Sequence, residues 1–549
     1  MKLGVDFGTT RIVVAFVDRG NYPVVSFEAP DASACEWFPP LVAVKQESRL
    51  YGWDAWAAQE DPAWTIARSL KRSLESAGPE TRVHIADQII PMQVLLRELA
   101  SALRTHLLQH STLPASPSEP LEVMLGVPAN ANSNQRFLTT EAFRQAGFRV
   151  LGLLNEPSAA SLEFGHRNRT SPSAKGKSRI LVYDLGGGTF DASLVELDDR
   201  ERFVIASEGI STLGGDDFDS ILADLALKVA ELSPEEQASL SQAELFRLHE
   251  ECREKKESLH PNTRRIVIDL GRIRAGWPEV SLPVNEFYEQ CRPLVDETLH
   301  ATEDLLAAYG YGVASSRDGQ STFQTPGSDG DERLEALYIT GGGSELPAIS
   351  RMLREAFGRR VRRSAYTRSA TAIGLAIQAD AESGYTLREK FTRFFGVWRE
   401  GERGHKIVFD PLFPKGTPLP RADDPPIVGK RRYRPVHNVG HFRYLECSHL
   451  TEGARPAGDI TLWDEICFPF DASLRDKTDL VGVAVTRPEE LSRPEVEIEE
   501  SYACDASGTL TVTITNISEG YSREYRLGRW AADNPPVIPA RRRKPAPRK

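Results

Sequence analysis

Residues 180–197 read ILVYDLGGGTFDASLVEL. An apolar run leads into Asp184, three glycines, a threonine and Asp191, and a second apolar run follows. The chain opens with a similar pattern, because residues 1–17 read MKLGVDFGTTRIVVAFV and place Asp6 before a glycine and two threonines. Apolar runs joined by a short glycine turn indicate β-hairpins. The sequence therefore predicts two acidic, glycine-rich hairpins that are far apart along the chain.

Each hairpin carries groups that suit a phosphate and a metal ion. Glycine lets the backbone approach an anion closely, and the N–H groups and hydroxyls of threonines can donate to phosphate oxygens. An aspartate repels phosphate, so its natural role is to hold Mg²⁺, directly or through water. Because these turns join strand to strand, they differ from the P-loop and from dinucleotide fingerprints, which join strand to helix. The residues concerned are Asp6, Gly8, Thr9 and Thr10 in the first hairpin and Asp184, Gly186, Gly187, Gly188, Thr189 and Asp191 in the second.

A third glycine turn precedes a predicted helix. Residues 336–357 read ALYITGGGSELPAISRMLREAF, in which Pro347 stands where a helix begins. A helix N-terminus beside glycine backbone offers a place for a nucleotide. Taken alone, either hairpin is better explained as a plain turn, and the third glycine turn is about equally well explained as a close-packed turn. Their joint presence, with matching acids in two of them, favours a phosphate site.

Length and composition indicate several domains. The chain has 549 residues, of which 40% are hydrophobic and 26% charged. The formal net charge of −11 argues against a nucleic-acid partner, because phosphate contacts require a basic surface. No apolar run of about 18 residues and no signal-peptide pattern occurs, so we expect no membrane partner. The six cysteines are scattered without metal-binding spacing, which favours a cytoplasmic location.

The composition of the chain changes after about Tyr385. Up to about Ala381 predicted strands and helices alternate, which is typical of an α/β architecture. After Tyr385, proline, arginine and glycine become frequent and helical periodicity fades. Near the end, period-two alternation places Leu510, Val512 and Ile514 on one face of a strand that follows a DASG turn. We therefore expect residues 396–530 to form a separate β-rich domain.

The motifs resemble those of the 70-kDa heat-shock protein family, the DnaK-type chaperones of the actin-like ATPase superfamily. GVDFGTT resembles the first phosphate motif of that family, YDLGGGTFDASL the second, and ITGGGSELP its adenosine motif. LLNEPSAASLEFG and ATAIGLAIQA resemble its two connecting helices, which cross at the hinge. The resemblance covers roughly residues 1–381. It extends more faintly to FDPLFPKGTPLP and CDASGTLTVTI, which resemble the family's peptide-binding β-sandwich.

The resemblance implies a fold and a set of partners. The expected fold is an α/β, two-lobed actin-like ATPase domain with duplicated mixed-sheet lobes, followed by an all-β, sandwich-like domain. The expected limits are 1–179 for lobe I, 180–381 for lobe II, 382–395 for the linker, 396–530 for the β-domain and 531–549 for a disordered basic tail. ATP or ADP and Mg²⁺ would bind between the lobes, with weak ATP hydrolysis. The β-domain would bind a protein or unfolded-peptide client, and a co-chaperone is an open alternative.

The resemblance also implies residue roles. Lys71, Glu156, Asp184 and Thr189 would form the catalytic set, in which Lys71 helps to position the attacking water. Asp6, Asp184, Asp191 and Glu156 would hold the metal ion, mostly through water. The implied nucleotide-binding residues are Gly8, Thr9, Thr10, Gly186, Gly187, Gly188, Gly214, Gly215, Lys256, Gly341, Gly342 and Gly343. Without the resemblance, Lys71 reads as an ordinary exposed helix lysine.

The predicted adenosine pocket departs from the family pattern. Glu345 stands where the family usually has an arginine, and Arg253 where it usually has a glutamate. Lys256 is retained, whereas His260 replaces a serine. Arginine stacks on bases and glutamate does not, so we expect reduced adenine affinity or a reorganised contact.

The parts that would link the cleft to the β-domain are only partly retained. Pro128 and Arg136 match the family's relay proline and arginine; Pro128 could instead simply end its strand, but its spacing from Arg136 slightly favours the relay. The linker lacks the family's leucine-rich, aspartate-bounded run, which puts ordinary allostery and J-domain stimulation in doubt. Phe391, Phe394 and Phe395 there could dock on the ATPase lobes, but the core of a domain is the better expectation. We also expect no helical lid, and hence weaker binding or faster exchange of a client.

These observations leave three hypotheses. The preferred one is a divergent chaperone-like ATPase that couples Mg-ATP to a protein partner. The second is a nucleotide-dependent interaction or scaffold protein with little or no turnover. The third, a small-molecule kinase of the same superfamily, lacks an identifiable acceptor pocket and is disfavoured by the NEPSAA motif.

Overall fold

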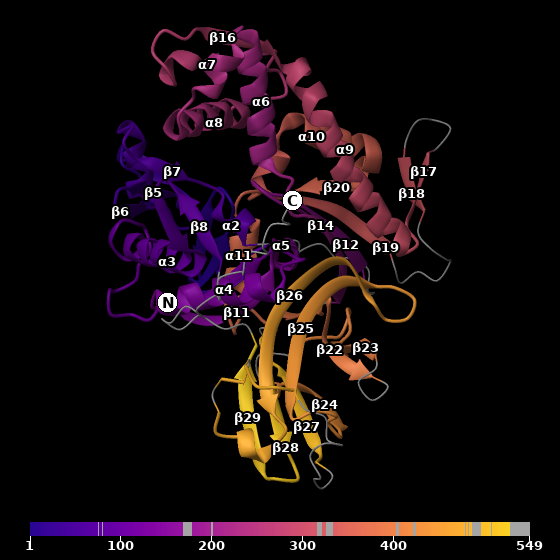
Figure 1. Ribbon diagram of the computed structural model, residues 1–549. Helices are drawn as coiled ribbons and strands as arrows, with labels where there is room; N and C mark the ends of the chain where they lie inside the picture. The colour runs from indigo at the N-terminus through magenta and orange to yellow at the C-terminus, as the bar shows by residue number, and fades with distance from the viewer. Residues whose placement is uncertain are drawn as a thin grey trace, which may run out of the picture.

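The computed structural model describes most of the chain. The described residues are 1–74, 76–78, 81–167, 178–198, 201–315, 321–324, 333–401, 406–420, 424–477, 479–480, 482–485, 496–506 and 508–527. The expected tail, residues 531–549, lies outside them. Figure 1 shows two α/β lobes, with a β-domain placed against lobe I. Within the described ranges, no helix combines the length and the apolar character needed to cross a membrane.

Lobe I is built on a sheet with strand order β11-β10-β1-β2. β1 pairs in parallel with β10 and antiparallel with β2, so the first glycine turn follows the carboxyl end of a central strand. The strands of this sheet are β1 (Lys2–Phe7), β2 (Ile12–Phe16), β10 (Glu122–Val127) and β11 (Arg149–Asn155). Smaller sheets contain β3 (Phe27–Glu28), β4 (Ala34–Cys35), β5 (Val42–Lys45), β6 (Ser48–Tyr51), β7 (Thr65–Ala67), β8 (Arg82–Ile85) and β9 (Gln88–Pro91). The helices are α1 (Trp53–Ala57), α2 (Leu70–Ser73), α3 (Met92–Gln109), α4 (Ser133–Gln145) and α5 (Glu156–Arg167).

Lobe II repeats this arrangement around β12. Its sheet has the order β20-β19-β12-β13-β14-β21, in which β12 pairs antiparallel with β13 and in parallel with β19. The strands of this sheet are β12 (Ser178–Leu185), β13 (Phe190–Asp198), β14 (Glu201–Ile210), β19 (Arg333–Thr340), β20 (Val361–Arg363) and β21 (Thr386–Arg388). Separate hairpins are β15 (Arg265–Asp269) with β16 (Glu279–Pro283) and β17 (Gly312–Ser315) with β18 (Ser321–Gln324). The helices are α6 (Gly215–Val229), α7 (Pro234–Ala238), α8 (Gln242–Glu257), α9 (Val284–Ala308), α10 (Pro347–Phe357) and α11 (Ala370–Ala379). The two predicted hairpins thus occupy equivalent places in duplicated lobes.

Helices α5 and α11 cross at the junction of the lobes. A Cβ added to Gly374 of α11 would lie 1.8 Å from the carbonyl oxygen of Ala159 in α5, so the crossing requires glycine there. α11 also packs on β1, where a Cβ on Gly4 would lie 2.2 Å from the backbone nitrogen of Ala376. The prediction that these two helices cross is confirmed.

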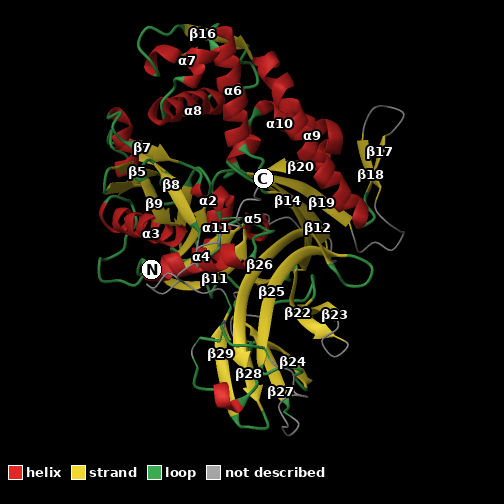
Figure 2. Ribbon diagram, viewed as in Figure 1, coloured by secondary structure: helices red, strands yellow, loops and turns green. Residues whose placement is uncertain are grey.

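The β-domain consists of two sheets, with orders β23-β22-β25-β26 and β24-β27-β28-β29 (Figure 2). The strands are β22 (Phe394–Gly401), β23 (Lys406–Phe413), β24 (Ile427–Tyr433), β25 (Val439–Leu450), β26 (Pro456–Pro469), β27 (Ile498–Cys504), β28 (Leu510–Asn516) and β29 (Tyr521–Arg526). β27 and β28 form the predicted hairpin, and the alternate residues Leu510, Val512 and Ile514 are fully buried. The core includes Phe395, and Phe391 stacks on Phe413 at 5.3 Å, so the phenylalanines belong to this domain as expected.

The linker docks on lobe II despite its unusual sequence. β21 adds a parallel strand to the edge of β14, where it faces Glu201, Arg202 and Phe203. Leu387 is buried beside α11, and the carboxylate of Glu389 accepts the backbone N–H of Asn155 at 2.7 Å. β22 begins at Phe394, inside the segment expected to be linker.

Candidate functional site

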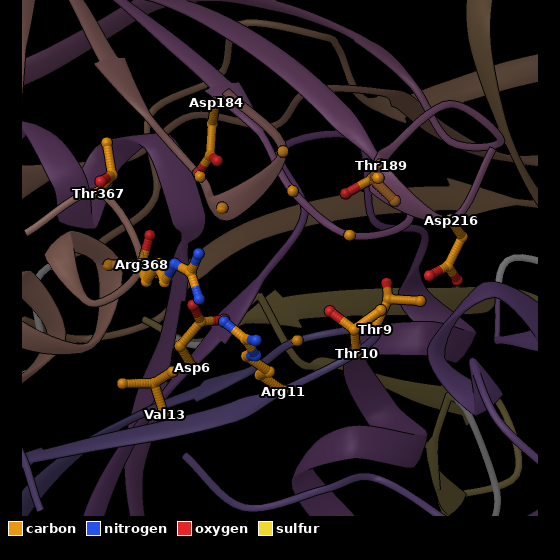
Figure 3. A pocket seen from close by; sticks show the side chains of 18 of the residues that line it. Asp6, Thr9, Thr10, Arg11, Val13, Asp184, Thr189, Asp216, Thr367 and Arg368 are labelled. Carbon is orange, nitrogen blue, oxygen red and sulfur yellow. The ribbon is translucent and has the colours of Figure 1, made fainter. Parts of the chain in front are cut away.

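The two glycine hairpins face each other across a cleft between the lobes. A Cβ on Gly187 would lie 2.4 Å from Oγ1 of Thr10, and a Cβ on Gly188 would lie 2.5 Å from Cγ2 of Thr9. Glycine at these two positions therefore lets the second turn approach the threonines of the first. Figure 3 shows Thr189 opposite Thr9 and Thr10, with their hydroxyls towards the cleft.

The cleft is open to solvent and is lined by most of the predicted residues. The predicted residues that line it are Asp6, Gly8, Thr9, Thr10, Lys71, Glu156, Asp184, Gly186, Gly187, Thr189, Gly215, Lys256, Gly341, Gly342 and Gly343. Asp191, Gly188 and Gly214 lie just behind this lining. Asp191 is the β-ladder partner of Asp184, and a Cβ on Gly214 would lie 2.5 Å from the nitrogen of Gly188.

Three carboxylates and one lysine line the floor of the cleft, and the carboxylate of Asp191 lies just behind them. Lys71 is 5% exposed, and its Nζ donates to Glu156 at 2.5 Å. Burial and the neighbouring Glu156 raise the pKa of Asp6 to about 7, although Lys71 opposes the shift. The same two causes raise the pKa of Asp191 to about 7 and that of Asp184 well above its ordinary value. Burial disfavours the charged form of Lys71, but Glu156 and Asp6 outweigh it, so the lysine pKa is raised. Lys71 is therefore not the ordinary exposed lysine that composition alone would suggest.

This cluster has more negative charge than the lysine can balance. Oxygen donors of this kind suit Mg²⁺, which commonly keeps several waters and takes one or two carboxylates directly. Among the described residues, no group of three or more histidine, cysteine, aspartate or glutamate side chains is arranged to hold a metal ion by itself. The donor set thus fits an ion that is held largely through water and phosphate oxygens.

The remaining glycine turns close the wall on the lobe II side. Gly341 has φ +84°, and a Cβ there would lie 2.3 Å from the carbonyl oxygen of Leu185. α6 begins at Gly215, whose carbonyl accepts from Nζ of Lys256 at 2.6 Å, and Lys256 also pairs with Asp219 at 2.7 Å. Three glycine turns and one buried lysine therefore meet at one place.

Ion pairs that the sequence motifs did not reveal cross the cleft. Arg68 of lobe I pairs with Asp216 of α6 at 2.7 Å, and the Ser69 hydroxyl donates to the same carboxylate at 2.5 Å. Arg72 binds Asp217 at 2.5 Å and also donates to the Gly188 carbonyl at 3.1 Å. The only sequence signals were an arginine next to Lys71 and the acidic pair that follows Gly215.

We call the end of the cleft lined by the two hairpins the phosphate end, and the end where the sequence predicts adenosine the base end. Arg253 lines the cleft, forms an ion pair with Glu250, and lies over Trp37 and Trp56 of lobe I at 5.7 and 5.5 Å from the ring centroids. His260 is exposed and does not line the cleft. The unusual Arg253 is thus explained by partners within this chain.

The model of the family described as Hsp70 protein matches residues 2–392 of the chain. The chain belongs to the Hsp70 family. Members of this family are chaperone-type, ATP-binding proteins, and the match covers both lobes, the docked strand β21 and most of the linker. The mixed α/β lobes and the strand-rich C-terminal region are consistent with an Hsp70 nucleotide-binding domain followed by a β-domain.

In this Hsp70-family chain, the two predicted relay residues lie between the cleft and the β-domain. Pro128 follows β10, and its carbonyl accepts the N–H of Ala131 at 3.0 Å. Arg136 of α4 donates to Oδ1 of Asn155 at 2.5 Å. The backbone N–H of the same Asn155 donates to Glu389 of the linker. Neither residue lines the nucleotide cleft.

The β-domain contacts lobe I at the start of α4. Glu446 of β25 accepts the backbone N–H of Ser133 at 3.0 Å and also binds its hydroxyl. Burial raises the pKa of Glu446, while Ser133, Arg393 and Arg136 oppose the shift. Arg526 of β29 lies over Phe137 of α4, 5.8 Å from the ring centroid. These contacts place the predicted relay helix α4 directly against the β-domain.

Proposed function

We propose that this protein is a chaperone-like ATPase that hydrolyses Mg-ATP between its lobes and couples the nucleotide state to a protein or peptide client on the β-domain. The observation that carries the proposal is the pair of facing glycine hairpins above a floor of three carboxylates and Lys71, with Asp191 just behind it. The family shows the general ATP-binding, chaperone-type function. Hydrolysis, the client and the residue roles are the proposal.

The chemistry assigned to these residues is positioning and charge neutralisation. Thr9, Thr10 and Thr189 would donate to phosphate oxygens from opposite sides of the cleft. Lys71, fixed by Glu156, would orient the attacking water, with no covalent intermediate on the protein. Bound Mg²⁺ would supply the charge that offsets the phosphates and the acidic side chains.

A short path supports coupling between the cleft and the β-domain. The Asp191 carboxylate accepts the N–H of Ala129 at 3.2 Å, the residue immediately after Pro128. Asn132 caps α4 by accepting the N–H of Gln135, and the next residue, Ser133, binds Glu446 of the β-domain. A shift of Asp191 on nucleotide binding would therefore be felt only a few residues away from the interdomain contact.

Single-turnover hydrolysis of ATP with Mg²⁺ tests the proposal. We expect slow turnover by the natural protein and a loss of roughly 100-fold or more in Asp184→Ala, because an acid that organises the metal is removed. Asp304→Ala, at an exposed position of α9, is the matched control. Equal rates in all three proteins, with no nucleotide bound by any of them, would refute the proposal.

The second candidate function is a nucleotide-dependent interaction protein with little or no turnover. The altered base end, with Glu345 and Arg253, is the observation that favours it. ATP binding that changes the capture of a client, without measurable phosphate release, would select this candidate over the first.

A further inference from the structure

Arg368 reaches into the base end of the cleft from the segment between β20 and α11. Its side chain passes the third glycine turn, because a Cβ on Gly342 would lie 3.8 Å from Cγ of Arg368. Figure 3 shows its guanidinium extending into the pocket towards Arg11 of the first hairpin turn. The Arg368 side chain is 36% exposed although it lines the cleft, so part of it is open to a ligand.

Two carboxylates hold the Arg368 guanidinium by its edges. Nε and Nη2 lie 2.8 and 2.6 Å from Oε2 of Glu345, and Nη1 lies 3.0 Å from Oε2 of Glu257. Glu345 is itself held by the Thr367 hydroxyl at 2.6 Å. Because a guanidinium donates its hydrogen bonds in its own plane, these contacts use the edges and leave the faces for stacking.

Glu257 is fixed from the opposite lobe. Nη2 of Arg11 lies 2.5 Å from the Glu257 carboxylate, and the Arg11 guanidinium lies over Trp37, 4.9 Å from the ring centroid. Burial would raise the pKa of Glu257, but Arg11 and Arg368 outweigh it and lower the pKa to about 2. The carboxylate that orients Arg368 is therefore ionised at neutral pH and held in place by both lobes.

We propose that Arg368 is the residue that holds the nucleobase, by stacking one face of its guanidinium on the purine ring. It does what an arginine at position 345 would do, and Glu345 acts as its positioning residue. Because each of its three nitrogens already lies against a carboxylate, Arg368 contacts the base through the flat face of the guanidinium rather than through hydrogen bonds to the edge of the base. Stacking of this kind tolerates different bases, so the site accepts ATP and GTP with similar affinity. This inference rests on the proposed nucleotide function.

Equilibrium titration with three probes tests the inference, each with Mg²⁺: ATP, GTP and inorganic tripolyphosphate, which has no base. For the natural protein we expect ATP and GTP affinities within about fivefold of each other, both tighter than tripolyphosphate. Arg368→Ala should weaken ATP and GTP by roughly tenfold and leave tripolyphosphate unchanged. Arg368→Lys should not rescue base binding, because an ammonium has no planar face.

Two further variants separate a base contact from a structural effect. Glu345→Gln should weaken ATP less than Arg368→Ala does, because Arg368 loses orientation but remains present. Arg362→Ala removes an arginine of lobe II that pairs with Glu335 at 3.5 Å outside the cleft lining, and it should bind all three probes normally.

The outcomes are distinguishable. An Arg368→Ala protein that binds ATP as tightly as the natural protein overturns the inference while the proposed function stands. An equal loss of tripolyphosphate binding, or a preference for ATP over GTP above about 100-fold, overturns it as well. If the natural protein binds none of the three probes, the proposed function fails and the inference with it.

Discussion

Replacing Asp191 by asparagine should stabilise the nucleotide-free protein in a way that depends on pH. Asp191 is 4% exposed and lies close to Glu156 and Lys71 at the floor of the cleft. Burial and Glu156 raise its pKa from 3.8 to about 7. Asparagine keeps an oxygen that can accept the Ala129 N–H, which is 3.2 Å from the natural carboxylate, but carries no charge.

The magnitude follows from the linkage between protonation and folding. An aspartate whose pKa is raised on folding does not destabilise the folded protein at a pH below its unfolded pKa. Above that value the loss of stability grows with pH, and it levels off once the pH exceeds the folded pKa. The shift of about 3 units corresponds to about 4 kcal/mol, because each unit is worth 1.36 kcal/mol. About 1.5 kcal/mol of this cost is already present at pH 5, and roughly 2.5 kcal/mol more develops between pH 5 and pH 8. The advantage of Asp191→Asn over the natural protein should therefore grow by up to about 2.5 kcal/mol from pH 5 to pH 8.

Urea denaturation followed by tryptophan fluorescence measures this effect, since Trp37, Trp53 and Trp56 form a cluster in lobe I. The titrations are run near pH 5 and near pH 8 with a chelator and without nucleotide. Asp87→Asn, at an exposed turn, is the control and should show no such pH dependence. A stability difference between Asp191→Asn and the natural protein that is the same at both pH values would refute the reasoning.

Two further predictions concern the interdomain contact and the third glycine turn. Glu446→Gln removes the charge that faces Arg393 at 3.8 Å beside Ser133, so the β-domain should undock more often. Limited proteolysis should then cut the linker several-fold faster than in the natural protein. An unchanged cleavage rate would show that the contact contributes little to docking. Gly341→Ala should lower the unfolding free energy by roughly 2–4 kcal/mol in thermal denaturation, because the strain of a positive φ and a clash with the Leu185 carbonyl add together. Gly276→Ala is the control: Gly276 has φ +90° but open space around it, so this variant should lose only about 1 kcal/mol. Equal losses in the two glycine variants would contradict the assigned clash.

The phosphate end of the cleft was predictable because it depends on short stretches of sequence. A strand, a glycine turn and an acid are adjacent in the chain, so their order already indicates a hairpin with a defined chemistry. The helix at Pro347 and the hairpin of β27 and β28 were predictable for the same reason. In each case the deciding residues are neighbours along the chain.

The base end was not predictable because its contacts join distant residues. Arg11 and Glu257 are 246 positions apart, and Arg68 and Asp216 are 148 apart. In the sequence each of these reads as an ordinary surface charge, and only the closure of the two lobes makes them partners. Glu345 was recognised as unusual, but nothing local to it pointed to Arg368.

The linker shows a different limit of sequence reasoning. Its side chains depart from the family pattern, and the sequence alone did not indicate that this segment would pair with lobe II as a strand. Strand pairing uses backbone N–H and C=O groups, which every residue except proline supplies in full. β21 therefore pairs with β14 without the leucine-rich run, and Leu387 is buried in the cluster that contains residues of α11.

Because β21 is the outermost strand of the lobe II sheet, the choice of where to truncate the chain has a practical consequence. A protein that ends at Ala381 would leave β14 as a bare edge, with unpaired backbone groups next to the site that Leu387 covers. Bare edges of this kind recruit strands from other molecules, so such a fragment should form strand-exchanged dimers or aggregates at high concentration. A fragment that extends to Lys390 would carry its own edge strand and should remain monomeric, which makes the linker a part of the ATPase fold as much as a connection to the β-domain.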